Sequence, residues 1–248
     1  MDLITVQNLS IGYGENAVVQ HDLNFQVEKG KIFIVMGGSG CGKTTLLRNL
    51  IGLQKPIRGK ILRNGIDFWG CPEEERQKIL NATGILFQSG ALWSAMTIAE
   101  NIALPLRQFT THSAAEIEEI CEYKLSLVGL AGKGTLYPSE LSGGMKKRAG
   151  LARAMALDPD VLFFDEPSSG LDPVSARRLD ELILELRDSL QSTIVVITHD
   201  LESIFMIGDD SLFLDAETQT AIARGNPREL RENCPIARVR SFLRRAAT

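Results

Sequence analysis

The stretch GGSGCGKT at residues 37–44 decides the fold of this chain. It follows an apolar run, Ile32 to Met36, and leads into TLLR at residues 45–48, which favours a helix. A strand, the pattern G-x-x-x-x-G-K-[ST] and a helix in this order form a phosphate-binding loop, because backbone N–H groups and the helix N-terminus surround phosphate oxygens. The alternative is an ordinary glycine turn, which the flanking strand and helix disfavour.

This loop assigns chemistry to individual residues. We expect Lys43 to reach the β- and γ-phosphates of a nucleoside triphosphate and the hydroxyl of Thr44 to bind Mg²⁺. The residues predicted to contact the nucleotide here are Gly37, Gly38, Ser39, Gly40, Cys41, Gly42, Lys43, Thr44 and Thr45.

A second motif ends another apolar strand. Residues 161–166 read VLFFDE, so two acids directly follow four apolar residues. Beside a phosphate-binding loop, Asp165 is expected to hold Mg²⁺ through water. Glu166 is then placed to accept a proton from the attacking water as a general base. The alternative is a surface acidic turn before Pro167.

A third motif, LSGGM at residues 141–145, narrows the choice of family. Ser142, Gly143 and Gly144 at the start of a helix make a second anion site, with a small-residue helix cap as the alternative. Taken with the two motifs above, this stretch resembles the signature of ATP-binding cassette ATPases. That signature usually reads LSGGQ, and Met145 departs from it at the fifth position.

The resemblance implies roles for residues elsewhere in the chain. Tyr13, 30 residues before Lys43, occupies the place of the aromatic that stacks on adenine, with a packed strand-edge tyrosine as the alternative. Gln88 resembles the glutamine that contacts Mg²⁺ and the attacking water. His199 resembles the histidine that contacts the γ-phosphate. Asp172 lies in the loop that crosses to a second subunit, a role compatible with its capping a helix.

An ATPase that binds ATP and Mg²⁺ is therefore implied. The catalytic residues would be Lys43, Gln88, Glu166 and His199, and the Mg²⁺ site Thr44, Gln88 and Asp165. Two cassettes of this family pair head to tail, with each ATP between the phosphate-binding loop of one and the signature helix of the other. One chain carries one of each, so a second copy is required. Hydrolysis separates the copies and drives integral membrane permease subunits.

The distance between motifs along the chain and the similarity of two short segments narrow the choice among classes of cassette. Gln88 and Ser142 are 54 positions apart, too few for the coiled-coil insertions of chromosome-maintenance and repair relatives. Residues 88–107 and 139–149, including Met145, are similar to cassettes of the Mla type. Those work at the cytoplasmic face of the bacterial inner membrane and move phospholipid, with a permease, an MCE-domain protein and a small regulatory subunit. Two alternatives stay open: an importer cassette for a polar solute such as an amino acid, and a clamp that binds nucleotide without hydrolysing it.

An apolar group lies in the similar stretch. Leu92, Trp93 and Met96 suit a socket for a permease helix. The alternative is that they pack inside the helical part of the chain.

The order of the motifs predicts an α/β fold. Short Val-, Ile- and Phe-rich runs alternate with helical patterns, which indicates a mostly parallel sheet and, with the phosphate-binding loop, a RecA-like P-loop NTPase core. Residues 4–9 and 23–27 read as strands before it, and 60–63 pairs with 66–68 through Asn64-Gly65, a type I′ turn sequence. This part forms an antiparallel β layer.

A helical insert follows the first half of the core. Thr97 with Glu100, and Ser113 with Glu116, match the capping box that opens a helix, and Gly129 is a left-handed stop. We predict one ATPase domain over 1–231, with its core at 1–88 and 161–225 and a helical subdomain at 89–160. A short, basic, helical tail covers 232–248.

The composition limits the alternatives. The 248 residues are 44% hydrophobic and 23% charged with a net charge of −4, which is typical of a globular domain and argues against a nucleic-acid partner. Four cysteines without C-x-x-C spacing predict neither disulfides nor a zinc site. The start of the chain lacks a signal-peptide profile, and no apolar run approaches the roughly 20 residues of a membrane span. A partner is expected to cross the membrane.

The tail differs from the rest of the chain in charge. From Arg224 to Thr248 there are seven arginines and two glutamates. Pro235 can open a helix with Ile236, Val239 and Leu243 on one face. We expect this stripe to dock on the other cassette or on a regulatory subunit; a solvated end and an anionic lipid surface are the alternatives.

Overall fold

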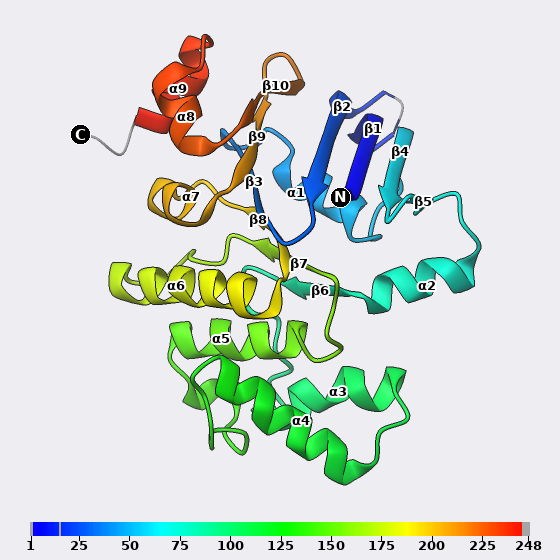
Figure 1. The fold of residues 1–248 in the computed structure, drawn as a ribbon, viewed down its shortest axis with the longest axis vertical. Helices are drawn as coiled ribbons and strands as arrows, with labels where there is room; N and C mark the ends of the chain where they lie inside the picture. The colour runs from blue at the N-terminus through cyan, green and yellow to red at the C-terminus, as the bar shows by residue number, and fades with distance from the viewer. Residues whose placement is uncertain (1, 15, 245–248) are drawn as a thin grey trace.

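The structure, a computed structural model, describes residues 2–14 and 16–244. Its strands form two sheets, one of four strands in the order β2-β1-β4-β5 and one of six in the order β10-β9-β3-β8-β7-β6 (Figure 1). The strands are β1 (Asp2–Gly12), β2 (Val18–Glu28), β3 (Ile32–Gly37), β4 (Arg58–Arg63), β5 (Ile66–Asp67), β6 (Thr83–Leu86), β7 (Val161–Asp165), β8 (Thr193–Ile197), β9 (Asp210–Asp215) and β10 (Thr220–Gly225).

The six-stranded sheet is parallel except at one edge. The pairs β9–β3, β3–β8, β8–β7 and β7–β6 are parallel, and only β10 runs antiparallel to β9. Its central strand β3 is buried along its whole length, as expected of a parallel strand covered on both faces. The α/β fold class with a mostly parallel sheet is therefore confirmed.

The side chains of β3 separate two hydrophobic cores because successive residues of a strand point to opposite faces. Ile34 and Met36 belong to the core beneath the helices. Phe33 and Val35 belong to the core shared with the antiparallel sheet. There Phe33 stacks on Phe25 of β2, with ring centroids 5.4 Å apart. This contact joins the two sheets.

The antiparallel sheet confirms the predicted β layer near the N-terminus. Asn64 and Gly65 connect β4 to β5 with φ of 49° and 82°. Positive φ at both positions is what a type I′ turn requires.

The helices begin and end largely where local sequence signals place them. Thr97 and Ser113 both form complete capping boxes, with Glu100 and Glu116. Gly129, just beyond α4, has a φ of 65°. The helices are α1 (Lys43–Leu50), α2 (Glu73–Asn81), α3 (Ile98–Phe109), α4 (Ala114–Leu127), the 3₁₀ turn η1 (Pro138–Glu140), α5 (Gly143–Ala154), α6 (Pro173–Leu190), α7 (Leu201–Ile207), α8 (Pro227–Asn233) and α9 (Ala237–Arg244).

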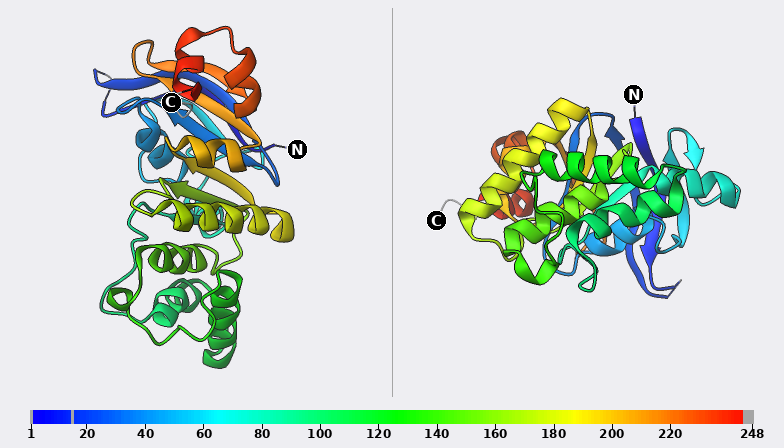
Figure 2. Two further views of the ribbon diagram at one scale, coloured as in Figure 1. Left: turned by 90° about the vertical axis from the view of Figure 1, so that its left-hand side faces the viewer. Right: turned by 90° about the horizontal axis from the view of Figure 1, so that it is seen from below.

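Helices α3, α4 and α5 form one end of an elongated molecule, and α8 and α9 lie at the other (Figures 1 and 2). None of the helices within residues 2–14 and 16–244 is long and apolar enough to cross a membrane. Helix α2 is an element that the sequence did not predict. None of its side chains is fully buried, and only Ile79 and Leu80 near its end pack against the core, so it lacks the long apolar stripe by which a surface helix is recognised.

The C-terminal tail departs from the expectation in two ways. The boundary predicted at residues 231 and 232 falls inside helix α8. The apolar stripe of α9 also has a partner within the same chain: Val239 and Leu243 are fully buried against the main core, and Phe242 meets Phe213 of β9 edge-to-face. The stripe is therefore not free to dock on another subunit in this structure. Residues 245–248 of the predicted tail lie outside the described residues.

Candidate active site

The phosphate-binding loop lies between β3 and α1 and lines a cavity of about 740 Å³. Residues from distant parts of the sequence meet around it. Its lining consists of Tyr13, Val19, Gly37, Gly38, Ser39, Gly40, Gly42, Lys43, Thr44, Thr45, Gln88, Glu166, His199, Leu201 and Phe242. Most of the residues predicted to bind nucleotide are therefore brought together.

The backbone conformation of the loop and the positive charge of Lys43 both suit a bound triphosphate. Gly42 has a φ of 96°, and a Cβ at this position would lie 2.6 Å from the Val19 side chain, so only glycine fits. The Lys43 ammonium donates to the carbonyl oxygens of Gly37 and Gly38, each at 3.0 Å. A cation held over a loop of backbone N–H groups at a helix N-terminus matches the charge of phosphate.

Cys41 contributes through its backbone. Its side chain is buried, and burial raises the pKa of its thiol, partly offset by nearby Lys43. Gln20 of β2, itself fully buried, donates its amide to the Cys41 carbonyl oxygen at 2.8 Å and to that of Asp215 at 2.9 Å. The loop is thus fixed to the neighbouring strands by a residue that the sequence analysis missed.

Glu166 and His199 both line the cavity and are in direct contact there. Glu166 Oε1 lies 2.7 Å from His199 Nδ1, within hydrogen-bond distance. Glu166 is half-buried, whereas most of the His199 side chain is exposed toward the cavity. This arrangement suits a base that accepts a proton from water and a histidine that stays free to contact a ligand.

The backbone of Glu166 is held in an unusual conformation. Its φ is 47°, in the left-handed region that non-glycine residues rarely adopt. Its N–H donates to Ile197 of β8 at 2.8 Å, and its carbonyl accepts from the Ser169 N–H at 3.2 Å. Such strain persists only where surrounding contacts maintain it, and it is typical of active sites.

Lys147 supplies another of these contacts. This lysine on α5 is almost fully buried, and its ammonium donates to the carbonyl oxygens of Glu166, at 3.3 Å, and of Gln88. Burial lowers its pKa, and Asp165 and Glu166 oppose that shift. No sequence motif assigned a role to Lys147. It stands in the basic run KKR at residues 146–148 after the LSGGM motif, and this charge alone does not reveal which carbonyl oxygens it contacts.

The acid and hydroxyl at the predicted Mg²⁺ site are compatible with a divalent cation. Asp165 ends β7 half-buried, and its pKa is raised by burial and by adjacent Glu166, against lowering by nearby cationic side chains. Thr44 lies exposed at the start of α1 and lines the cavity. Carboxylate and hydroxyl oxygens are ligands that Mg²⁺ prefers. Asp165 itself does not line the cavity.

Gln88 lines the cavity. Its amide nitrogen donates to the Ser169 hydroxyl at 3.1 Å, and this bond joins the loop after β6 to the loop after β7. Tyr13 lies at the rim of the cavity, 68% exposed, with its hydroxyl 3.5 Å from that of Thr45. Its ring is therefore accessible to a planar ligand.

The signature residues lie apart from this cavity. Ser142 caps helix α5 by accepting from the Met145 N–H at 3.3 Å, and it lines a second cavity together with Gly144. Gly143 is exposed at the same helix start. Asp172 caps α6 by accepting from the Ser175 N–H at 3.0 Å, which lowers its pKa, and it is also exposed. A single chain thus does not bring its signature onto its own phosphate-binding loop.

Comparisons with known proteins agree with this geometry. Residues 20–169 match the family model described as ABC transporter. The chain is 42% identical over 98% of its length to the intermembrane phospholipid transport system ATP-binding protein MlaF of Haemophilus influenzae, of which it covers 90%. It is 40% identical over 98% to the MlaF of Escherichia coli, of which it covers 88%. It is 38% identical over 97% to a probable ribonucleotide transport ATP-binding protein of Mycobacterium leprae, of which it covers 68%.

Solved structures share the architecture. CbiO1 of Clostridium perfringens, part of an ABC transporter complex, has a TM-score of 0.83 at 25% identity over 94% of this chain and 96% of its own. A dimeric post-hydrolysis state of the cassette MJ0796, bound to ADP and phosphate, has a TM-score of 0.80 at 26% identity over 90% and 98%. The chain belongs to the ABC transporter family and forms its ATP-hydrolysing cassette.

Proposed function

We propose that this chain is the ATPase subunit of a phospholipid transporter of the bacterial envelope and that it acts as a head-to-tail pair of two copies. The observation that carries this proposal is the 42% identity to MlaF over 98% of this chain and 90% of MlaF. A match along both proteins includes the helical part that distinguishes cassette classes. The same similarity supports a place at the cytoplasmic face of the inner membrane, beside a permease.

In this proposal the triphosphate of ATP is gripped from two sides. The 37–44 loop and Lys43 of one copy hold the phosphates, and the helix tip at Ser142 of the other copy donates backbone N–H groups to the γ-phosphate. The separation of Ser142 from the cavity within one chain supports this pairing. The residues assigned to each half are Tyr13, Gly37, Gly38, Ser39, Gly40, Cys41, Gly42, Lys43, Thr44, Thr45, Gln88, Asp165, Glu166 and His199 on one copy, and Ser142, Gly143, Gly144 and Asp172 on the other.

Hydrolysis then follows from groups that the chain already positions. Glu166 accepts a proton from water, whose oxygen forms a bond to the γ-phosphorus while the bond to the β-phosphate oxygen breaks, which leaves ADP and phosphate. His199, held by Glu166, contacts the γ-phosphate. Thr44, Asp165 and Gln88 would hold Mg²⁺, which neutralises charge on the β- and γ-phosphates. The hydrogen bond between Glu166 and His199 links the base to the phosphate contact.

A surface near α3 suits the permease. Trp93 is 60% exposed, and the 93–97 turn that carries it is fixed by Asn101 of α3. The fully buried Asn101 amide donates to the Trp93, Met96 and Thr97 carbonyl oxygens, and its oxygen accepts from the Trp93 N–H at 2.7 Å. A large aromatic side chain held out on a rigid turn is typical of a binding hot spot. Leu92 packs partly against the main core, so Trp93 is the stronger anchor.

An MCE-domain protein and a small regulatory subunit complete the proposed assembly. They are supported by the similarity to MlaF, the ATP-binding protein of an intermembrane phospholipid transport system. A polar-solute transporter is the second candidate, because the mycobacterial relative is described as a probable ribonucleotide transport protein. The motifs that bind and hydrolyse ATP are common to both, so only the cargo distinguishes them.

Reconstitution with the permease and the MCE protein that neighbour its gene tests the proposal. Proteoliposomes containing the complex should transfer a fluorescent phospholipid when ATP is added, and phospholipid should raise ATP turnover. Stimulation by an amino acid or a ribonucleotide, without lipid transfer, would favour the second candidate and contradict the first. Trp93→Ala should abolish co-purification of the permease, whereas Tyr123→Ala, an exposed aromatic on α4, should not.

A further inference from the structure

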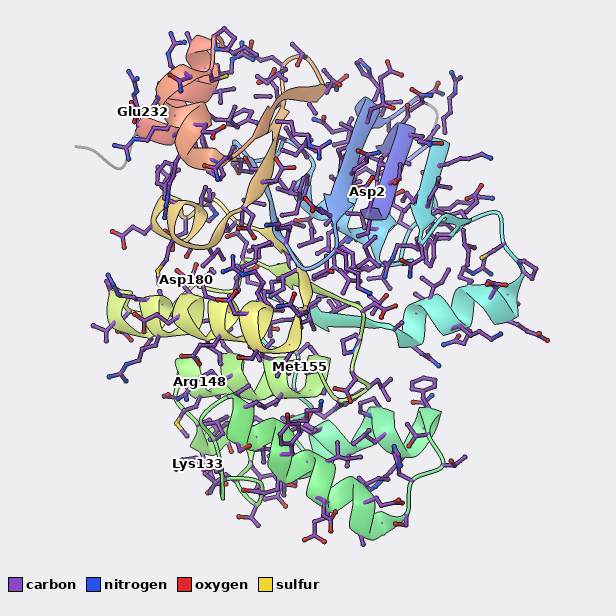
Figure 3. All side chains as sticks on the ribbon, in the orientation of Figure 1. Asp2, Lys133, Arg148, Met155, Asp180 and Glu232 are labelled. Atoms are coloured by element: carbon purple, nitrogen blue, oxygen red, sulfur yellow. The ribbon has the colours of Figure 1, made fainter. Side chains whose placement is uncertain are left out.

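A chain of polar side chains connects helix α6 to the two loops of the active site. Asp180 of α6 accepts from the Ser203 hydroxyl of α7 at 2.7 Å, and Figure 3 places Asp180 on the side of α6 that faces α7. Ser203 Oγ is also 3.3 Å from Asp200 Oδ2. Asp200 Oδ2 in turn accepts from the Ser168 hydroxyl at 3.1 Å.

Asp200 holds together the two segments that carry the reacting groups. It follows His199 directly, and its other oxygen caps α7 by accepting from the Glu202 N–H at 3.1 Å. Ser168 stands two residues after Glu166 and next to Ser169, which binds the Gln88 amide. The position of Asp200 therefore affects the base and the γ-phosphate contact together.

Ser203 has too few protons for its two neighbours. A serine hydroxyl donates one hydrogen bond, and an ionised carboxylate only accepts. When Asp180 is ionised, the Ser203 proton goes to Asp180, and Asp200 Oδ2 keeps only the bond from the Ser168 hydroxyl. When Asp180 carries a proton, that proton goes to Ser203 Oγ, and the Ser203 hydroxyl is released to donate to Asp200. The two protonation states of Asp180 thus give Asp200 different hydrogen-bond partners.

Asp180 is suited to change its protonation state. Its side chain is 3% exposed, and its second oxygen, Oδ1, has no hydrogen-bond partner among residues 2–14 and 16–244. Burial raises the pKa of Asp180 to about 6, and the hydrogen bond from Ser203 opposes the shift only in part. The charged groups that shift its pKa are acids: Asp200 and Glu202 on the α7 side, and Glu181 on its own helix. Each of them disfavours a further negative charge.

We propose that Asp180 is a positioning residue for ATP hydrolysis: when protonated, it directs the Ser203 hydroxyl to Asp200 and so fixes the loops that carry Glu166, His199 and Ser168. Loss of the proton removes this hydrogen bond from Asp200. The proposal deepens the ATPase site and depends on ATP turnover, not on the identity of the cargo.

The test is the pH profile of kcat for Asp180→Asn, measured with the full chain at saturating ATP between pH 5 and pH 8. The asparagine amide donates to Ser203 at every pH and so imitates protonated Asp180. The ratio of variant to wild-type kcat should be near one at pH 5 and rise, with a midpoint near pH 6, to about fivefold above pH 7, the rate equivalent of one hydrogen bond. Dividing by the wild type cancels ionisations elsewhere in the site.

Two further variants separate positioning from a general effect of charge. Asp188→Asn makes the same chemical change at an exposed position of α6, and its ratio should stay flat. Ser203→Ala removes the relay, so its own kcat profile should lose the inflection near pH 6. An Asp180→Asn ratio that does not change with pH, or a Ser203→Ala profile that keeps the inflection, would overturn the proposal.

A measurement of thermal stability detects the protonation of Asp180 without relying on ATP hydrolysis. Because the pKa of Asp180 is raised on folding, the folded protein binds its proton more tightly, and wild-type stability falls as the pH rises toward 6. The Tm of Asp180→Asn relative to wild type should therefore increase between pH 5 and pH 7. A constant Tm difference would show that Asp180 does not titrate there and would equally overturn the proposal. Neither measurement involves a lipid, so failure here leaves the transport proposal intact.

Discussion

The ammonium nitrogen of Lys147 lies 3.3 Å from the backbone carbonyl oxygen of Glu166 and donates a hydrogen bond to it. Lys147 belongs to α5, the helix whose first turn carries the signature residues, and it also donates to the Gln88 carbonyl oxygen. The same buried cation thus joins the signature helix, the loop after β6 and the strained backbone of Glu166, the proposed general base. A movement of α5 would therefore displace a hydrogen-bond donor of the Glu166 backbone.

Lys147→Met should lower kcat for ATP hydrolysis by about tenfold or more. The methionine fills similar space but leaves the Glu166 carbonyl oxygen without this donor, and a lost hydrogen bond to a charged group is worth about 1.5–3 kcal/mol. The affinity for ATP should change little, because Lys147 does not line the nucleotide cavity. Steady-state kinetics and binding of a fluorescent ATP analogue check both points. Lys146→Met on the same helix is the matched control, and an equal loss of kcat there would refute the assignment.

Glu166→Gln should bind ATP but lose hydrolysis by about 10²- to 10⁴-fold, because glutamine cannot accept the proton of the attacking water. The γ-phosphate of the unhydrolysed ATP should then hold the two copies together. Light scattering with Mg²⁺ and ATP should show a stable dimer for the variant and a transient one for wild type. Turnover at the wild-type rate would show that another group is the base. Glu119→Gln, which changes an exposed acid on α4, should behave as wild type.

Contiguous motifs made much of this site predictable. An apolar strand leads directly into GGSGCGKT, and the strand within VLFFDE ends in its two acids. In both places the strand pattern and the polar residues that follow it indicate the same site. The capping boxes at Thr97 and Ser113 formed as expected because their partners are only three residues away. Local chemistry of this kind needs no knowledge of tertiary contacts.

Contacts made to distant backbone atoms could not be predicted in this way. Lys147 reaches carbonyl oxygens 59 and 19 positions away, and every residue carries a carbonyl, so sequence gives no signal for the pairing. The apolar stripe on α9 was visible in the sequence, but its spacing does not indicate which surface covers it. In the structure α9 packs on the core of its own chain, where Phe242 contacts Phe213 of β9.

Two adjacent glycines should respond differently to alanine. Gly37 has a φ of 149°, and a Cβ there would lie 2.3 Å from the Leu214 carbonyl oxygen, so Gly37→Ala should lower Tm markedly. Gly38 is exposed, with nothing within 4 Å of its Cβ position, so Gly38→Ala should keep the wild-type Tm. Because the motif G-x-x-x-x-G-K-[ST] leaves position 38 open to any residue, Gly38→Ala should also keep the wild-type affinity for ATP. Thermal unfolding without nucleotide and calorimetric titration with ATP measure the two quantities; a lowered Tm for Gly38→Ala would contradict this reasoning.

The ion pair that anchors α9 predicts a pH-dependent stability. Arg238 donates to both oxygens of Asp215, each at 2.6 Å. Burial acts to raise the pKa of Asp215, but hydrogen bonds from Arg238 and Thr218 outweigh it and hold the pKa below its ordinary value. A group with a depressed pKa stabilises the fold above its unfolded pKa, near 4, and loses that contribution as the pH falls through its folded pKa.

Arg238→Met should therefore lower Tm most at neutral pH, because it leaves Asp215 ionised and buried without its cation. As the pH falls below about 4, Asp215 becomes protonated in the variant and the Tm deficit should shrink, since a neutral carboxyl no longer needs the arginine. Arg244→Met, an exposed arginine on the same helix, should show little deficit at any pH. Thermal unfolding from pH 3 to pH 8 measures all three proteins. If the Arg238→Met deficit were the same at pH 3 and pH 7, the arginine would act through packing of its stem and not through the charge of Asp215.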